Sequence, residues 1–400
     1  MSHLEVYPSA LNSDRFEMVA LGSIVVERAE RASLMELPAL SVGKLGVTAQ
    51  LEGVAKQNSE VLRKVVRKGD LVINSRADRK GAAGLSLYEG SVSPVYSVMI
   101  PKAELLSAKY GHYLLRSVAF QEEFFRGGTG IVSDLWSTNF TRMVRIRVPL
   151  PPLTIQNSIA SYLDRETGEI DAMLAKLASL SESVSERRRE IVRSILKSVG
   201  QTVRLGLVVD VVSGSGFPDR FQGIPDEELP FYKVSSLSNV DRQVLTDADN
   251  TVSREIADQL GARIIPSQSV VMAKIGAALL LARYALTSRP SCIDNNMQAL
   301  VPHEGVIISR FLAYAMEDVS ISSLVKPGPV PSLDVIGMKM SRIAFSPSIK
   351  EQCRIADHLD EVTGRIDAML ATIDELKALL VERRAALITD VVTGRKKVPA

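Results

Sequence analysis

A stretch that occurs twice constrains the fold of this chain more than any other feature. Residues 156–188 and 352–384 align without a gap at a constant shift of 196 positions, so that Gln156 matches Gln352 and Arg188 matches Arg384. Self-similarity at one fixed shift indicates a repeated structural unit. The two copies therefore set the architecture of everything that lies between them.

Each copy predicts a long helix. Apolar residues recur every seven positions, a spacing typical of coiled coils. We therefore expect the two helices to pack on each other along this line; the alternative is two unrelated amphipathic helices, each packed on its own domain. Gly168 and Gly364 interrupt both copies at the same place, and each helix is expected to bend there. The apolar line comprises Leu163, Ile170, Leu177, Val184 and Ile191 in the first copy, and Leu359, Ile366, Ile373, Leu380 and Leu387 in the second. Companion apolar positions on the expected seam are Met173, Leu174, Leu180 and Ile195, and Met369, Leu370, Leu376 and Val391.

Length and composition indicate an ordinary globular protein of more than one domain. The chain has 400 residues, of which 46% are hydrophobic and 24% charged, and a chain of this size forms two or three domains. No apolar run reaches about 18 residues and no basic-then-apolar segment opens the sequence, so neither a membrane span nor a signal peptide is expected. Cys292 and Cys353 are too few for a disulfide framework, which favours a reducing cytoplasm.

Short β-branched runs and turn signals precede each copy of the helix in the same order. Residues 1–150 form a first domain, residues 151–200 the central helix, residues 201–346 a second domain and residues 347–400 the distal helix. The predicted fold class is α+β: two α/β domains separated by a long antiparallel two-helix coiled coil with pseudo-twofold symmetry. In the first domain we expect strands at Met18–Val26, Leu71–Asn74, Tyr96–Ile100 and Met143–Val148, a helix at Lys109–Phe125, and a first long helix from about Thr154 to Val199.

No catalytic or metal-binding pattern is found in the sequence. It contains neither a phosphate-binding G-x-x-x-x-G-K-[ST] loop nor a dinucleotide-binding G-x-G-x-x-G loop. Asp367 with Glu375 and Lys377 fits a nuclease-like spacing, but the three lie on a charged helix face, where such residues usually support the helix. The histidines and cysteines are scattered, so no catalytic residue, metal ligand or cofactor is predicted.

Basic and amide side chains in both domains are candidates for DNA contacts. Arginine binds guanine and asparagine binds adenine through paired hydrogen bonds, although a solvated loop explains each run as well. The first 150 residues carry an excess of basic residues, whereas residues 200–345 carry a slight acidic excess, which counts against DNA binding by the second domain. The first-domain candidates are Arg63, Lys64, Arg67, Lys68, Asn74, Arg76, Arg79, Lys80 and Asn139, and the second-domain candidates are Ser215, Arg220, Lys233, Lys274, Asn295 and Asn296.

The order of these segments resembles one known family. A variable domain is followed by a helix that begins P-x-x-x-x-Q-x-x-I-A-x-x-L-D and continues through I-D-A-M-L to E-R-R, and both recur before a final V-T-G. This order, over nearly the whole chain, is similar to the specificity subunit of type I restriction-modification systems. One departure is Ile155, where a glutamate commonly precedes the glutamine. The matching residues are Pro151, Gln156, Ile159, Ala160, Leu163, Asp164 and Ile170 to Leu174, then Pro347, Gln352, Ile355, Ala356, Leu359, Asp360 and Ile366 to Leu370, and Val392 to Gly394.

The resemblance implies a DNA-binding subunit that performs no chemistry itself. Each variable domain would be a target recognition domain for one half of an asymmetric, bipartite DNA sequence, and the helices would set the gap between the halves. Two methyltransferase (modification) subunits would dock on the helices, and motor-nuclease restriction subunits would join them in the cytoplasm. Candidate partner-binding residues are Gln156, Arg187, Arg188, Gln352, Arg383 and Arg384, although the arginines are equally explained by ion pairs with the facing helix.

Two other functions remain open on the sequence alone. The first is a non-catalytic coiled-coil scaffold or adaptor that binds no specific DNA. The second is the specificity part of a related methylase system that lacks restriction. A fused restriction or methylation enzyme is disfavoured, because a catalytic domain of typically 150 or more residues has no segment to occupy.

Overall fold

The chain folds into two compact units, each built from one globular part and portions of both long helices. Unit 1 combines Met1–Ala178 with Asp374–Ala400, and unit 2 is Ser179–Ile373. The computed structural model describes residues 10–33, 36–43, 46–50, 62–76, 81–128, 137–224, 226–237, 244–246, 248–326 and 328–398.

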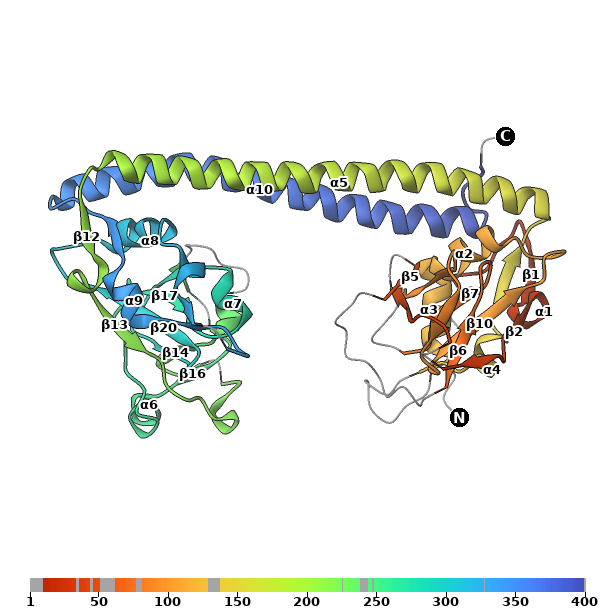
Figure 1. The fold of residues 1–400 in the computed structure, drawn as a ribbon, viewed down its shortest axis with the longest axis horizontal. Helices are drawn as coiled ribbons and strands as arrows, with labels where there is room; N and C mark the ends of the chain where they lie inside the picture. The colour runs from red at the N-terminus through yellow and green to blue at the C-terminus, as the bar shows by residue number, and fades with distance from the viewer. Residues whose placement is uncertain are drawn as a thin grey trace. The chain divides into compact units, whose positions relative to one another are not determined.

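The two long helices are present where the repeat predicts them. Helix α5 runs over Leu153–Ser198 and helix α10 over Ile349–Val392 (Figure 1). All ten residues of the heptad line are buried or partly buried, as expected for a packed seam. The companion positions divide: Leu174, Ile195, Leu370 and Val391 are at least partly buried, but four others were wrongly expected on the seam. These four are exposed, namely Met173 (51%), Leu180 (48%), Met369 (53%) and Leu376 (45%), because they lie on the outer helix face.

Unit 1 is a set of small antiparallel sheets covered by short helices. The central sheet has the strand order β2-β10-β7-β8, and β1 pairs with β11 where the chain leads into α5. The strands are β1 (Glu17–Ala20), β2 (Val25–Glu27), β3 (Arg31–Ala32), β4 (Leu40–Gly43), β5 (Gly46–Ala49), β6 (Arg63–Val66), β7 (Leu71–Asn74), β8 (Ala83–Leu85), β9 (Gly90–Val92), β10 (Tyr96–Pro101) and β11 (Arg147–Leu150). The helices are α1 (Leu21–Ile24), α2 (Ala108–Arg116), α3 (Val118–Arg126) and α4 (Phe140–Met143).

Three elements of unit 1 differ from the sequence prediction. The helix expected over 109–125 is split at Ser117, whose Oγ accepts the Phe120 N–H and starts α3. The strand expected over 143–148 begins only at Arg147, because Asn139 caps the short helix α4 immediately before it. The strand expected over 18–26 is broken by one helical turn, α1.

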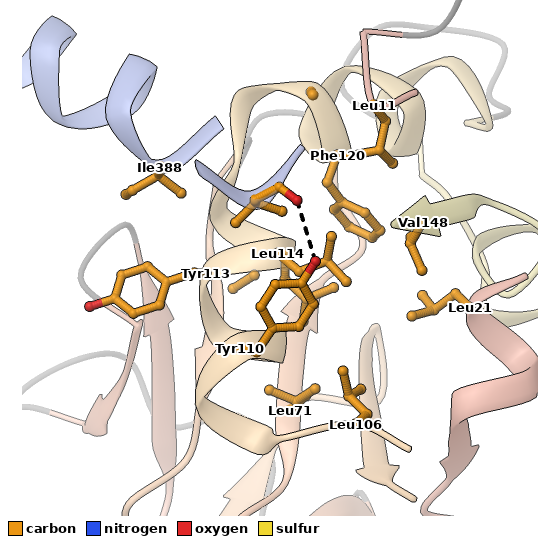
Figure 2. Packing of buried hydrophobic residues seen from close by; sticks show 14 of the residues in the cluster. Leu11, Leu21, Leu71, Leu106, Tyr110, Tyr113, Leu114, Phe120, Val148 and Ile388 are labelled. Carbon is orange, nitrogen blue, oxygen red and sulfur yellow. Dashed lines mark hydrogen bonds between the residues drawn. The ribbon is translucent and has the colours of Figure 1, made fainter. Parts of the chain in front are cut away.

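The core of unit 1 joins the globular part to α10. Tyr110, Tyr113 and Phe120 from α2 and α3 pack in one cluster with Ile388 (Figure 2). The buried Tyr110 hydroxyl lies 2.8 Å from the Pro149 carbonyl oxygen, to which it donates a hydrogen bond. The globular part and the helix pair therefore share one hydrophobic core in unit 1.

Unit 2 repeats this plan with a larger sheet. Its main sheet has the order β13-β20-β17-β18-β15, and α8 packs between that sheet and the long helices (Figure 1). The strands are β12 (Thr202–Arg204), β13 (Val209–Ser213), β14 (Leu229–Tyr232), β15 (Val244–Leu245), β16 (Thr251–Val252), β17 (Val270–Ala273), β18 (Tyr284–Thr287), β19 (Cys292–Ile293), β20 (Met297–Pro302), β21 (Val325–Lys326), β22 (Ser332–Leu333) and β23 (Arg342–Ala344). The helices are η3 (Leu205–Leu207), η4 (Asp219–Phe221), α6 (Arg254–Gln259), η5 (Val234–Leu237), α7 (Ala277–Leu280), α8 (Ser309–Glu317), η6 (Ile321–Leu324) and α9 (Val335–Met340).

Candidate nucleic-acid interface

In unit 1, three predicted DNA-binding residues meet at one pocket. The pocket has a volume of about 530 Å³ and lies at the end of the central sheet. Lys64, Arg76 and Asn139 line it, together with Glu27, Tyr96 and Phe140. This combination of a cation, a guanidinium, an amide and two aromatic rings suits a nucleic-acid surface.

The chain's own contacts position these side chains. Lys64 Nζ lies 3.1 Å from Glu27 Oε1, so its ammonium group is held at the pocket wall. The exposed Asn139 accepts the Arg142 N–H through its side-chain oxygen and thereby caps α4. Arg76 is exposed, and its backbone N–H is bound by the Asn74 side chain. Asn74 itself is only 5% exposed, so its side chain shapes the loop from within and does not face a ligand.

The remaining predicted DNA-binding residues of unit 1 differ in how exposed they are. Arg63 is 7% exposed and donates hydrogen bonds to the side chain and carbonyl of Ser91, and burial lowers its pKa. It therefore supports β6 and β9 internally. Arg67 is exposed and pairs with Glu30 at 2.8 Å, and Lys68 is also exposed. Arg79 and Lys80 lie outside the described residues.

In unit 2, five predicted DNA-binding residues gather around one buried carboxylate. Asp294 is 6% exposed and accepts the Asn296 N–H at 2.8 Å. Burial raises its pKa, against the opposing effect of hydrogen bonds from the Asn296 and Val234 backbone and of two nearby lysines. The residues that surround it are Ser215, Lys233, Lys274, Asn295 and Asn296.

The loops of this cluster are tied together by close contacts. A Cβ at Gly214 would stand 1.9 Å from the Asp294 carbonyl oxygen, so only glycine allows these two segments of the backbone to approach so closely. Lys233 Nζ donates to Gln222 Oε1 at 2.7 Å, and Gln222 in turn binds the Phe217 carbonyl. Arg220 is exposed two residues before Gln222, with its guanidinium over the Phe221 ring. A cationic, amide-rich surface results despite the slight acidic excess of the domain.

A buried glutamine joins each globular part to a long helix in the same way. Gln156 and Gln352 are both 0% exposed. Gln156 accepts the Ser107 N–H at 2.8 Å and donates to the Leu105 and Pro151 carbonyls. Gln352 makes the equivalent three bonds to the backbone of Ile308, Val306 and Ser346. Both side chains are buried and hydrogen-bonded within the chain, so neither is available to a partner subunit.

A second repeated contact links a tyrosine to the same helices. The Tyr113 hydroxyl donates to Asp164 at 2.7 Å and lies 3.3 Å from the Thr167 hydroxyl. In unit 2, Tyr314 makes the same contacts with Asp360 and Thr363, at 2.6 and 3.0 Å. Neither tyrosine was predicted as a functional residue, although Asp164 and Thr167 recur in the repeat and indicated a conserved contact at this place.

Two contacts between α5 and the C-terminal segment of unit 1 run in opposite chain directions. In unit 1, Asp171 meets Arg384 at 3.2 Å, whereas the earlier Tyr162 meets the later Lys396. The two helices are therefore antiparallel there. In unit 2, Arg188 binds Asp367 at 2.7 Å, which is the same pair displaced by 196 positions.

The predicted partner-binding arginines fall into two classes. Arg188 is 6% exposed, and Arg384 is partly buried in its pair with Asp171. Burial lowers the pKa of Arg188, but Glu317 and Asp367 outweigh it and leave that pKa raised. Arg187 and Arg383 are exposed, and only these two lie on a free helix surface.

The described residues contain no group of three or more His, Cys, Asp or Glu side chains able to hold a metal ion. Over the same residues, no helix is long and apolar enough to cross a bilayer.

Comparison with known proteins identifies similar chains of one kind. No protein-family model matches this sequence. The specificity subunit of the type I restriction enzyme EcoR124I/EcoR124II from Escherichia coli is 22% identical over 267 residues, which is 63% of this chain and 62% of the length of that relative. Less than two thirds of the relative is therefore matched.

One solved structure shares the fold over almost the whole chain. A chain in a structure of a type I restriction-modification system, described for its complex assembly and conformational transition, superimposes with a TM-score of 0.62 at 16% identity, covering 96% of this chain and 100% of that one. A crystal structure of the HsdS subunit from Thermoanaerobacter tengcongensis gives a TM-score of 0.42 at 16% identity, covering 96% of this chain and 98% of that one. The resemblance predicted from the sequence is therefore confirmed: over part of its sequence this chain is similar to the specificity subunit of a type I restriction enzyme, and it shares its fold with a chain of a type I restriction-modification system.

Proposed function

We propose that the chain is the DNA sequence-specificity subunit of a type I restriction-modification complex and performs no chemistry itself. The observation that carries the proposal is the duplicated joint: Gln156 and Gln352 make the same three backbone bonds in two units. The surfaces that these joints support differ between the units. A fixed frame with two different polar surfaces suits a protein that reads two unlike half-sites.

In this proposal residues 1–150 and 201–346 are the target recognition domains. Unit 1 contacts DNA through Lys64, Arg76 and Asn139 around its pocket. Unit 2 uses Lys233 and Lys274, which lie near Asp294, and the exposed Arg220. The neighbouring Ser215, Asn295 and Asn296 supply hydrogen-bonding groups for bases.

The partners in this proposal are two methyltransferase subunits and restriction subunits, and the complex acts in the cytoplasm. Two features repeat on the exposed faces of α5 and α10. Met173 and Met369 expose 51% and 53% of their surface, and Arg187 and Arg383 are exposed as well. Exposed apolar residues that repeat at equivalent positions suit two copies of one docking partner.

The direct test is DNA binding by the purified chain with its methyltransferase partner. Sequencing of methylated positions in host DNA, with and without the gene, identifies the target. Fluorescence anisotropy then compares that split target with a duplex in which one half is scrambled. We expect specific binding to be about 1,000-fold tighter or more for the split target. Equal affinity for both duplexes would favour a non-catalytic scaffold instead.

Substitutions then test the two surfaces separately. Arg76→Gln and Lys274→Gln should each weaken binding and relax base specificity in one half of the target, because a base contact of about 1–3 kcal/mol is lost. Lys197→Gln, at an exposed position of α5, is the matched control and should leave both quantities unchanged. Methylation of the target without any cleavage in cells that hold the complete gene set would favour the methylase system that lacks restriction.

A further inference from the structure

One surface of unit 2 exposes three large aliphatic side chains on two adjacent elements. Leu207 in η3 is 66% exposed, and Ile336 and Met340 in α9 are 75% and 54% exposed. Ile336 and Met340 are four residues apart and so share one face of α9. The two elements touch, because a Cβ at Gly206 would lie 3.1 Å from Lys339 Cβ. We refer to Leu207, Ile336 and Met340 as the aliphatic patch.

Unit 1 holds the same backbone framework, so the equivalent positions can be identified. Leu21 donates its N–H to the Ile146 carbonyl in unit 1, and Leu205 donates its N–H to the Ser341 carbonyl in unit 2, both at 2.9 Å. Met143 and Met338 are both 0% exposed beneath these contacts.

The equivalents of the aliphatic patch in unit 1 are all polar. By this register Leu207 corresponds to Ser23, Ile336 to Thr141 and Met340 to Arg145. The three unit 1 residues are exposed as well. The surface is therefore open in both units, but only unit 2 makes it apolar.

The surroundings of the aliphatic patch are basic. Arg204 and Arg342 lie opposite each other in the β12–β23 pair, both exposed, and Lys339 stands beside Met340. Like charges directly opposite on paired strands are unfavourable. Among the described residues, none of these three cations forms an ion pair, and Arg342 binds only the oxygens of Thr202. In unit 1, Ala20 and Val144 hold the places of Arg204 and Lys339.

An aliphatic centre with a basic rim matches an acidic, amphipathic protein segment. Exposed aliphatic clusters with polar rims mark interaction sites, and methionine is enriched in protein interfaces. DNA fits less well, because nucleic-acid interfaces are more polar than protein interfaces and the patch offers no hydrogen-bonding side chain. A second copy of the chain would bring two basic rims together.

We propose that Leu207, Ile336 and Met340 form a docking site for an acidic, amphipathic segment of another subunit, occupied once per chain. The proposal rests on the proposed function only in placing that subunit within the restriction-modification complex. The site makes the two ends of the chain unequal for protein partners, because unit 1 has no counterpart.

Site-specific photo-cross-linking in the complex, co-expressed from its own genes, tests this assignment. A benzophenone amino acid replaces Ile336 in one preparation and the equivalent Thr141 in the other. We expect the probe at 336 to cross-link a protein subunit at a segment rich in acidic and aliphatic residues, with a yield at least about tenfold above that of the probe at 141. Thr141 also lines the unit 1 pocket, so cross-links from that position to DNA are expected. Equal yields of protein cross-links at both positions, or cross-links from position 336 to DNA, to lipid or to a second copy of this chain, would overturn the proposal.

A triple variant provides an independent measurement. Leu207→Ser, Ile336→Thr and Met340→Arg give unit 2 the residues of unit 1 at exposed positions, so folding should be unaffected. Affinity for the cross-linked subunit should fall at least about tenfold, with unchanged affinity for split-target DNA. Unchanged subunit affinity would overturn the docking site alone. Failure of the unsubstituted complex to prefer split-target DNA would instead overturn the proposed function.

Discussion

Units 1 and 2 hold their long helices by the same hydrogen bonds, but the residue at the end of the neighbouring short helix, α2 or α8, has opposite charge in the two units. In unit 2, Arg188 binds Asp367 at 2.7 Å and Glu317, at the end of α8, at 3.1 Å. In unit 1, Arg384 binds Asp171, and the position equivalent to Glu317 is Arg116 at the end of α2. Burial lowers the pKa of Arg116, and the nearby Arg384 lowers it further.

The comparison separates what the duplication preserves from what it allows to change. The glutamine and tyrosine contacts recur in both units, whereas the charge at the end of α2 or α8 reverses. The glutamine contacts, which we call the glutamine clamp, therefore form whichever charge is present. The stability of the joint does depend on that charge, because a cation at this position repels the helix arginine and a carboxylate attracts it. We expect the joint of unit 2 to be the more stable of the two.

Reversing the charge in unit 2 should have the largest effect. Glu317→Arg leaves Arg188, which is only 6% exposed, beside a second cation. Breaking one partner of a buried pair costs about 3–5 kcal/mol. Hydrogen exchange in peptides from α8 should report that loss, and Glu304→Arg, at an exposed position of the same unit, should change stability by less than about 0.5 kcal/mol. An equally small effect of both substitutions would contradict the importance of the pair.

Removing the glutamine clamp should cost nearly the same in both units. Gln156→Ala and Gln352→Ala each leave a buried N–H and two carbonyls without the side chain that binds them, at a cost of about 3 kcal/mol. Urea unfolding of the full chain measures the loss, and Gln259→Ala, at an exposed position, is the control. A loss in one unit only would show that the two joints are not energetically equivalent.

Acid should weaken unit 1 more than unit 2 at this joint, because α2 of unit 1 carries His112 with a lowered pKa. Burial, with Arg116 next to it, lowers the pKa of His112 from 6.5 to about 4, and Ala313 holds the corresponding place in unit 2. The folded state keeps His112 neutral while the unfolded state binds a proton. The stabilisation is therefore complete above pH 6.5 and is lost as the pH falls towards 4, by up to about 3 kcal/mol.

Hydrogen exchange corrected for the intrinsic rate at each pH measures this difference, with α2 peptides compared with α8 peptides. His112→Ala should lower stability at pH 7, because the Leu85 N–H loses its acceptor, yet it should remove the extra loss in acid. An acid response that persists in this variant would assign the effect to another group.

Giving unit 1 the charge of unit 2 should have the smallest effect. Arg116→Glu places a carboxylate beside Arg384 and should stabilise unit 1 by about 1 kcal/mol, since the Asp171–Arg384 pair is partly solvated. A double-mutant cycle with Arg384→Ala isolates the interaction. A destabilisation that is independent of Arg384 would show that Arg116 contributes through other contacts.

Much of the frame could be predicted from the sequence, because duplication and heptad spacing are strong signals. The first long helix was expected from about Thr154 and begins at Leu153. The same spacing could not predict which apolar residues are buried. Met173 and Leu180 fit the apolar pattern but are exposed, because a repeat period identifies apolar positions and not the surface that packs against them.

The candidate site was harder to predict because neighbouring basic residues share a composition but not an environment. Arg63 and Lys64 are adjacent, yet β6 alternates its faces, so Arg63 is buried against Ser91 and Lys64 reaches the pocket. Likewise the repeated glutamine reads equally well as a partner contact or an internal clamp, and only its hydrogen bonds decide.

The most direct test of the whole account is the affinity of the complex for its split target after one surface at a time is changed. Arg76→Gln should reduce discrimination at one half of the target and leave the other half unchanged, and Lys274→Gln should do the reverse. Measured with single-base variants of each half, the two substitutions should affect opposite halves. Equal effects of either substitution on both halves would contradict the assignment of one half-site to each unit.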